Sequence, residues 1–197
     1  MKAAAFKEWD SVVRALGSGE QCIILRKGGI HEKNRIFEIR NRSFFLFPTF
    51  EHQELKDLNP RGQYWLSVSQ ASGKISGKIR LEYQAKLEEA WFTNSWASVD
   101  KLSDFHAASC EGIRKKFDWG DQPGLYVLLV RVYRLNPAFE IEDLPAYAGC
   151  RSWVDVEVPS AVLGVSQPVL KEDLFIQNRE RLRGILTGCE IKTEDPV

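Results

Sequence analysis

The stretch GLYVLLVRVYRL, residues 124–135, decides the fold class of this chain. Apart from Arg131 and Arg134, every residue after the initial glycine is aliphatic or aromatic. A strand whose two faces are both apolar is typical of the interior of a sheet, so we expect this strand to be central. Pro137 follows closely and is predicted to end the strand, because proline has no backbone N–H to donate to a neighbouring strand.

A second stretch, IRLEYQAKLE at residues 79–88, alternates apolar side chains with polar or charged ones. A helix would place Ile79 and Leu81 on nearly opposite sides, whereas a strand places them on one face. The alternation therefore predicts a strand with one face in water. Strands with a polar face favour a mixed or antiparallel sheet over a doubly wound parallel one.

Three main helices are predicted from the spacing of apolar residues. The first covers residues 3–16, and the second runs from a Ser98 cap to about Phe117. The third covers residues 168–188, is amphipathic, and turns Leu174 among others toward the core. Together with the strands, they indicate an α+β fold in which a mixed or antiparallel sheet is flanked by three main helices.

Two shorter apolar runs, at residues 20–27 and 35–47, are predicted to pair as a hairpin. A loop with a short helix is expected over residues 54–66. The stretch QASGKISGK, residues 70–78, is rich in Gly and Ser and is the most linker-like part of the chain. We expect one compact domain over residues 1–197. If the chain divides, the seam lies at 70–78, between an αββ part and a βαβα part.

The composition is that of an ordinary globular protein, with 44% hydrophobic and 27% charged residues. The 27 basic and 27 acidic side chains cancel, which counts against a general nucleic-acid coat but leaves room for a local basic patch. No apolar run approaches the ~20 residues that cross a bilayer. Charged residues interrupt the N-terminal segment. We therefore expect no signal peptide, no membrane attachment and a soluble cytoplasmic protein.

The sequence predicts neither a metal site nor a cofactor. The four cysteines are scattered without a CxxC pair, which excludes a zinc ribbon, and the three histidines have no metal-ligand spacing. Glu-x-Lys, the end of a metal-dependent nuclease motif, occurs at residues 54–56 and 190–192. Neither copy lies on a predicted strand beside an upstream acidic residue, so both are rejected.

The first candidate site is LRKGGIHEK, residues 25–33. Its paired glycines would let the backbone approach a phosphate beside the cations Arg26 and Lys27, with the carboxylate Glu32 close by. The Gly-Lys-Ser/Thr order of a P-loop is missing, and no downstream glutamate run supports a Nudix box. The plainer interpretation, a hairpin turn with solvated charges, is favoured by the turn chemistry.

The second candidate is the trio Glu51, His52 and Gln53, which follows the apolar stretch SFFLFPT at residues 43–49. A histidine beside a carboxylate can act as a general base. Adjacent residues of an extended chain point in opposite directions, however, so Glu51 and His52 would not converge. Recognition suits the trio better, because Gln and His side chains hydrogen-bond bases and ligands. A polar loop leaving a strand is the alternative.

The third candidate is YAGCRSWV, residues 147–154. Arg151 and Trp153 occupy alternate positions, so on a strand they would share a face, where a planar cation and an aromatic ring suit a base or an anion. Cys150 could act as a nucleophile, but a buried, unreactive thiol is favoured. The six tryptophans could line an aromatic pocket for a base, although core packing is favoured for them as well.

Several of these segments together resemble one family. KEW, ALGSGEQCIILRKGGIHE, FFLFPTFEHQ, LLVRVYRL and YAGCRSWV occur in this order between Ala4 and Val154. They are similar to a bacterial and archaeal family catalogued as domain of unknown function 1802. Some members are associated with Mrr-like restriction endonuclease domains, which implies a link to restriction-modification and a nuclease partner protein. This chain lacks such a nuclease domain, so the resemblance implies a module that reads DNA, in a β-rich fold that is PUA-like in part.

The function that we expect is a non-catalytic recognition module for DNA or RNA. The cations and the Trp153 ring would supply binding, and the trio at residues 51–53 would lend specificity. Eight residues are expected to bind: Arg26, Lys27, Glu32, Glu51, His52, Gln53, Arg151 and Trp153.

Two other functions stay open. One is a small enzyme that uses Glu32, His52 and Glu51 on a nucleotide or a phosphorylated substrate. The other is a protein-interaction domain, which would present exposed aromatic residues around Trp65 or Trp91 without a concave pocket. We expect binding rather than catalysis.

Overall fold

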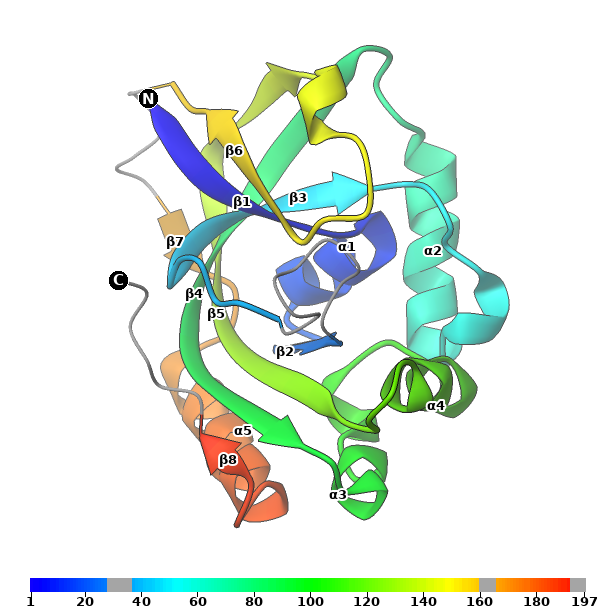
Figure 1. Cartoon of the computed structure of the whole chain (residues 1–197). Helices are drawn as coiled ribbons and strands as arrows, with labels where there is room; N and C mark the ends of the chain where they lie inside the picture. Colours follow the sequence, from blue (N-terminus) through cyan, green and yellow to red (C-terminus); the bar gives the residue numbers. More distant parts are fainter. Residues whose placement is uncertain (28–36, 160–165, 192–197) are drawn as a thin grey trace.

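The computed structural model describes residues 1–27, 37–159 and 166–191. The strands in these ranges are β1 (Lys2–Trp9), β2 (Ile23–Arg26), β3 (Ser43–Thr49), β4 (Lys78–Thr93), β5 (Leu125–Glu142), β6 (Trp153–Glu157), β7 (Ser166–Pro168) and β8 (Glu190–Ile191). The α-helices are α1 (Asp10–Ser18), α2 (Pro60–Ser72), α3 (Trp96–Asp100), α4 (Cys110–Asp118) and α5 (Glu172–Ile185). The described strands form one sheet in the order β2-β5-β4-β3-β1-β6, with β7 beside β5 and β8 beside β4 (Figure 1).

The two longest strands, β4 and β5, pair antiparallel over most of their length. In Figure 1 they run together from the top of the molecule to the bottom. Every residue of β5 from Val127 to Val130 is buried, as predicted for an interior strand. Since β1 and β3 pair in parallel while β4 pairs antiparallel with β3 and β5, the sheet is mixed. The predicted α+β class is confirmed.

The prediction that Pro137 ends its strand is wrong, since β5 continues to Glu142. The pairing with β4 is interrupted at this point. Tyr83 pairs with Arg134 and Leu81 pairs with Phe139, so a single residue of β4 lies opposite residues 135–138 of β5. The additional residues of β5 form a bulge that contains the proline. A bulge leaves residues out of the ladder, so the missing N–H costs no strand-pairing hydrogen bond.

The helix predicted over residues 3–16 is wrong in its first half, which is the strand β1. Phe6 and Trp9 have helical spacing with Val13 and Leu16, but only the latter two lie on α1. β1 lies between β3 and β6. Both of its faces pack against other residues, so its burial shows no alternation that would have marked a strand.

The predicted hairpin between residues 20–27 and 35–47 is also wrong. β2 pairs with β5, whereas β3 pairs with β1 on one side and with β4 on the other. β3 is buried from Phe44 to Pro48, as an interior strand must be. β2 and β3 follow one another in the sequence but are therefore not neighbours in this sheet.

The single helix predicted over residues 98–117 is two helices, α3 and α4. They start after Ser95 and Ser109, whose side chains accept hydrogen bonds from backbone N–H groups of the first turn. Between them, the buried Ala107 donates its backbone N–H to the Gln21 side chain at 2.9 Å. A helix cannot run through this point, because that N–H is bonded outside it.

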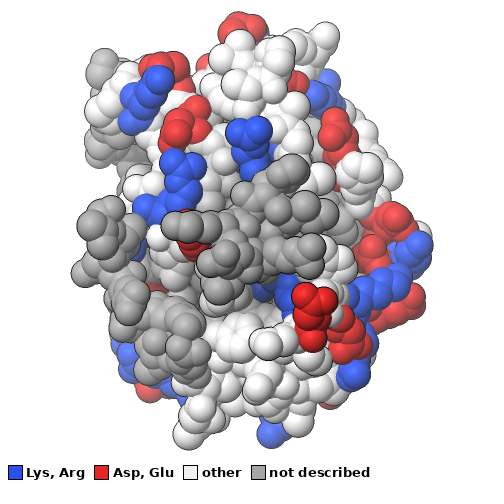
Figure 2. Space-filling model, in the orientation of Figure 1, with Lys and Arg blue, Asp and Glu red and all other residues white. Residues whose placement is uncertain are grey.

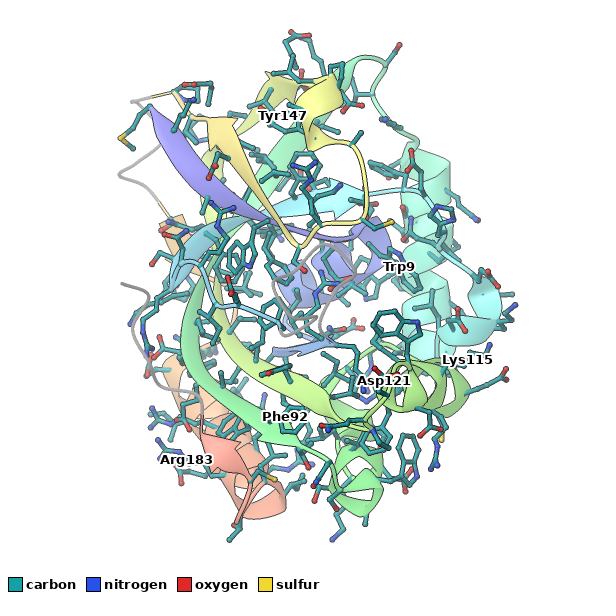
Figure 3. The ribbon with its side chains drawn as sticks, viewed as in Figure 1. Trp9, Phe92, Lys115, Asp121, Tyr147 and Arg183 are labelled. Atoms are coloured by element: carbon teal, nitrogen blue, oxygen red, sulfur yellow. The ribbon has the colours of Figure 1, made fainter. Side chains whose placement is uncertain are left out.

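α2 is longer than the short helix expected in its place and begins after Asn59, whose side chain caps it. α5 matches the predicted C-terminal helix, but Phe175 faces the core and Leu174 is 45% exposed. Arg183 of α5 binds Glu89 of β4 at 2.6 Å (Figure 3). No helix in the described part of the chain is long and apolar enough to cross a membrane.

Three clusters of apolar side chains cover the sheet. One of them includes Phe47 of β3 and Tyr147, and it forms the floor beneath the site described below. Another joins Phe44 to Val130, from the two sides of the predicted seam at residues 70–78. The single domain stays a prediction, which these contacts support.

Candidate functional site

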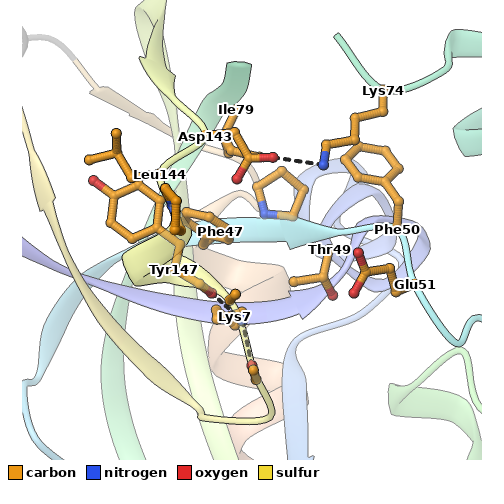
Figure 4. Close-up of a pocket in the computed structure, with 14 residues that line it drawn as sticks. Lys7, Phe47, Thr49, Phe50, Glu51, Lys74, Ile79, Asp143, Leu144 and Tyr147 are labelled. Atoms are coloured by element: carbon orange, nitrogen blue, oxygen red, sulfur yellow. Dashed lines mark hydrogen bonds and ion pairs between the residues drawn. The ribbon is translucent and has the colours of Figure 1, made fainter. Parts of the chain in front are cut away.

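A pocket opens where β3 ends, with a cavity of about 390 Å³. β1 contributes Lys7, and the end of β3 with the residues that follow contributes 47–51. The far wall is the loop 143–149 after β5, and Lys74 lies at the rim (Figure 4). Four segments that are far apart in the sequence therefore meet at this pocket.

Lys7 is fixed in the pocket by the backbone of the facing loop. Its ammonium donates to the carbonyl oxygens of Tyr147 at 2.7 Å and Gly149 at 2.8 Å (Figure 4). Burial lowers the pKa of Lys7, and the positive charge of Arg151 lowers it further. An ammonium has three N–H donors, and the described part of the chain accepts two of them. The third has no acceptor within that part of the chain.

Aromatic rings and further charges complete the pocket. Tyr147 is buried and packs edge-on against Phe47, with ring centroids 5.5 Å apart. The half-buried Phe50 lies on the opposite side of the pocket in Figure 4. At the rim, Lys74 binds Asp143 at 2.7 Å. The pocket thus combines an apolar floor with cations and carboxylates at its edge.

The first predicted cluster is engaged inside the fold. The Arg26 guanidinium binds Glu8 at 3.1 Å, donates to the carbonyl oxygen of Lys7, and lies 4.5 Å from the Phe6 ring centroid. The Lys27 ammonium donates to the carbonyl oxygens of Phe117 and Gln122. Both cations therefore hold elements together.

Part of the same cluster, the paired glycines and Glu32, lies outside the described residues. The structure therefore neither supports nor opposes a role for Glu32, and the predicted approach of this backbone to a phosphate stays a prediction.

The trio at residues 51–53 does not converge on one point. Glu51 lines the pocket, and His52 is exposed on a turn with a positive φ of 59°. The Gln53 side chain accepts a hydrogen bond from the Ser11 N–H at 3.1 Å. It thereby satisfies a free backbone donor in the first turn of α1, whose own N-cap residue supplies no side-chain hydrogen bond. Of the three, Glu51 belongs to the pocket.

Arg151 and Trp153 are separated by burial. Trp153 is 7% exposed, and its ring centroid lies 4.8 Å from that of Phe6 and 5.1 Å from that of Phe44. Its indole N–H donates to the Glu38 carbonyl oxygen. It is a core residue and cannot share a stacking surface with Arg151. Arg151 is exposed just before β6, and its backbone N–H donates to the carbonyl oxygen of the pocket residue Gly149 at 3.1 Å. It therefore lies at the pocket end of the sheet but is not among the residues that line the pocket.

The other tryptophans do not gather into an aromatic pocket. Trp91 is buried in the core, and Trp65 donates its indole N–H to Glu20 at 3.0 Å. Cys150, expected to be buried, is exposed. In the described ranges no group of three or more His, Cys, Asp or Glu side chains could hold a metal ion.

Lys7, Lys74 and Asp143 belong to the pocket but were not predicted from the sequence. A signal for Lys7 exists in KAAAFKEW, residues 2–9. On a strand, Ala3, Ala5 and Lys7 share one face, and a lone lysine at the end of a small apolar face is unusual.

The chain belongs to the DUF1802 family. The model of this family, described as domain of unknown function, matches residues 5–181. No curated protein matches the chain. The resemblance seen in the sequence is therefore confirmed over most of this DUF1802 chain.

Among solved structures, this DUF1802 chain is similar to ASCH from Zymomonas mobilis, with 12% identity and a TM-score of 0.40 over 65% of this chain and 66% of that one. A serine-to-alanine mutant of the same protein gives 12% identity and a TM-score of 0.43, covering 91% and 94% of the two chains. A tyrosine-to-phenylalanine mutant gives 14% identity and a TM-score of 0.43, covering 78% of this chain and 89% of that one. The PUA-like part of the expected fold stays a prediction.

Proposed function

We propose that this protein is a non-catalytic recognition module for DNA or RNA that holds one nucleotide in the pocket at the end of β3. The observation that carries the proposal is the Lys7 ammonium, fixed by two backbone carbonyl oxygens, in the lining of a cavity of about 390 Å³. Arg151, whose backbone N–H donates to the pocket residue Gly149, adds a second cation at the same end of the sheet.

The chemistry of the pocket suits a nucleotide. Cations bind phosphate oxygens, and aromatic rings such as Phe50 stack on bases of any sequence. The cavity falls in the range of about 300–1,000 Å³ that is usual for small-molecule sites. Glu51 and Asp143 can accept hydrogen bonds from the exocyclic amino groups of a base.

The charge distribution supports a local site rather than a broad basic surface. The net charge is zero. In Figure 2, basic and acidic side chains are interspersed over the face shown. We also propose a role in restriction-modification, in which this module would read DNA while a nuclease partner protein cuts it.

The protein-interaction alternative required exposed aromatic residues around Trp65 or Trp91 without a concave pocket. Trp91 is buried, Trp65 is hydrogen-bonded to Glu20, and a pocket is present. The enzyme alternative stays a prediction, because one of its three residues, Glu32, lies outside the described residues.

Fluorescence anisotropy with labelled single-stranded and duplex DNA and RNA, together with thermal shift against nucleotides, tests the proposal at ~50 mM salt, where phosphate contacts are least screened. We expect binding that Arg151→Ala weakens about tenfold, as the loss of a charged hydrogen bond would. Lys101→Ala removes an exposed cation on the loop after α3 and should leave the affinity unchanged. Failure of every nucleotide and nucleic acid to bind would refute the proposal.

A further inference from the structure

A second pocket adjoins the first. Its cavity is about 290 Å³, and it shares Pro48 and Phe50 with the pocket at the end of β3. Its other side is formed by α1 and by the start of β4, including Arg14, Lys78 and Arg80. Neighbouring residues of a strand point to opposite faces, so Ile79 in the first pocket and Lys78 and Arg80 in the second place the two pockets on opposite sides of β4. They meet at Pro48 and Phe50, and we call the two pockets together the β3-end groove, with the Phe50 ring at the boundary between them.

Apart from Lys7, the cations that line this groove form ion pairs with carboxylates. Arg14 binds Asp10 at 2.6 Å, and Arg80 binds Glu82 at 3.0 Å. In both pairs the cation is the more exposed partner, at 23% against 7% and 50% against 36%. The cation is also the more exposed partner in three further ion pairs: Lys74–Asp143, Lys78–Glu140 and Arg80–Glu140. The carboxylates fix the cations in place, and the cations present their charge to solvent.

This order is not general in the protein. Outside the groove the order is mixed: Arg183 is more exposed than Glu89, whereas Glu172 is far more exposed than Arg131, at 74% against 6%, and Asp104 is more exposed than Arg181. The cations of the groove's ion pairs therefore form a positive outer layer, beside which the exposed carboxylate of Glu51 also lines the groove. A ligand with regularly spaced anionic groups fits such a layer.

We infer that the β3-end groove holds a single strand of nucleic acid over at least two nucleotides. One base occupies the first pocket, Phe50 stacks between it and the next base, and Lys78 and Arg80 contact the phosphates on the side of the second pocket. Phe50 can enter between bases only where they are unstacked, which favours a single strand over a duplex. This inference rests on the proposed function and specifies its ligand.

The test compares a mononucleotide, a dinucleotide and a tetranucleotide, as DNA and as RNA, with a duplex of the same sequence. We expect the affinity to rise about tenfold or more from mononucleotide to tetranucleotide, and the duplex to bind more weakly than the strand. Comparison of the DNA and RNA oligonucleotides shows which of the two backbones the groove prefers.

Substitutions in the second pocket separate its contribution from that of the first. Lys78→Ala with Arg80→Ala should lower the ratio of tetranucleotide to mononucleotide affinity by about tenfold, since two phosphate contacts are lost. Lys86→Ala is the matched control, because Lys86 lies on the same strand, pairs with Glu88 at 3.1 Å as Arg80 pairs with Glu82, and is not among the residues that line the groove.

Phe50 is tested by a conservative pair of variants. Phe50→Leu should weaken tetranucleotide binding about tenfold through loss of stacking, and Phe50→Tyr should retain it. Thermal unfolding of both variants is the control for whether the fold is kept.

The possible outcomes distinguish the two proposals. If mononucleotide and tetranucleotide bind equally well and the double variant changes neither, the inference fails while the proposed function stands. If no nucleic acid or nucleotide binds, both fail. A polyglutamate peptide that binds the groove as tightly as the tetranucleotide would overturn the inference in favour of an acidic protein ligand.

Discussion

His106 is a buried histidine that the fold keeps neutral. It is 4% exposed, and its Nδ1 accepts a hydrogen bond from the Ala108 N–H at 3.3 Å. Burial lowers the pKa of His106 to about 4, and the positive charge of Lys116 adds to this effect. In the unfolded chain the imidazole returns to its ordinary pKa of about 6.5.

This difference predicts a loss of stability in mild acid. As the pH falls below about 6.5, His106 becomes protonated in the unfolded chain, whereas in the folded protein it stays neutral until about pH 4. The free energy of unfolding therefore decreases between these two pH values. The loss should reach about 2 kcal/mol near pH 5. Urea unfolding between about pH 7.5 and 4.5 measures it.

His106→Asn is the control, because an amide oxygen can accept from the Ala108 N–H but does not titrate. Its stability should fall less than that of the wild type over the same pH range. Parallel curves for the two proteins would show that His106 does not contribute.

Single residues of the site could be predicted only in part. Glu51 and Arg151 were proposed from the sequence and lie at the pocket end of the sheet, where Glu51 lines the pocket and the Arg151 backbone bonds to the pocket residue Gly149. Trp153 was proposed for the same surface and is in the core, because strand alternation gives the face of a side chain but not which face is covered. Lys7 and Tyr147 meet across 140 residues of sequence, and no local pattern predicts such a contact.

At the scale of elements, α1 packs directly against the Tyr83 ring of the sheet at Gly17. A Cβ added there would lie 2.1 Å from the Tyr83 ring of β4. Tyr83 is itself buried, with the Arg134 guanidinium 5.2 Å from its ring centroid, so the ring has little room to move. The absence of a side chain at this position thus sets the distance between helix and sheet.

We predict that Gly17→Ala destabilises the protein although it improves helix propensity. Overpacking against Tyr83 should cost about 2 kcal/mol, which exceeds the gain of up to about 1 kcal/mol from replacing glycine in a helix. Gly184→Ala on α5 is the matched control, since nothing lies within 4 Å of the added Cβ. That variant should be more stable than the wild type in urea unfolding. An equal gain in both variants would contradict the close packing of α1.

The strands were predictable where their pattern was long. The ten alternating residues at 79–88 and the apolar stretch at 124–135 correspond to β4 and β5. β1 was missed because both of its faces are covered. The order of strands could not be predicted either, because the parallel β1–β3 pair joins residues about 40 positions apart, and pairing at that range depends on the whole sheet.

At the scale of the whole molecule, the balance of charge limits how the protein can hold nucleic acid. It has 27 basic and 27 acidic residues, and the two signs are interspersed on the face shown in Figure 2. Affinity must then come from a few placed cations. The β3-end groove supplies these through Lys7, Lys78 and Arg80, with Arg151 at the same end of the sheet.

This arrangement predicts a shallow dependence of binding on salt. Each phosphate neutralised on a single strand contributes about −0.7 to the slope of log affinity against log salt concentration, so three or four contacts give about −2 to −3. Anisotropy titrations of a single strand of about twelve nucleotides, long enough to reach beyond the groove, measure the slope between about 25 and 200 mM salt. The variant with Lys78→Ala and Arg80→Ala should reduce it to about −1, because two phosphate contacts are removed. A slope steeper than about −5 would mean that a wider basic surface, and not the groove, binds the strand.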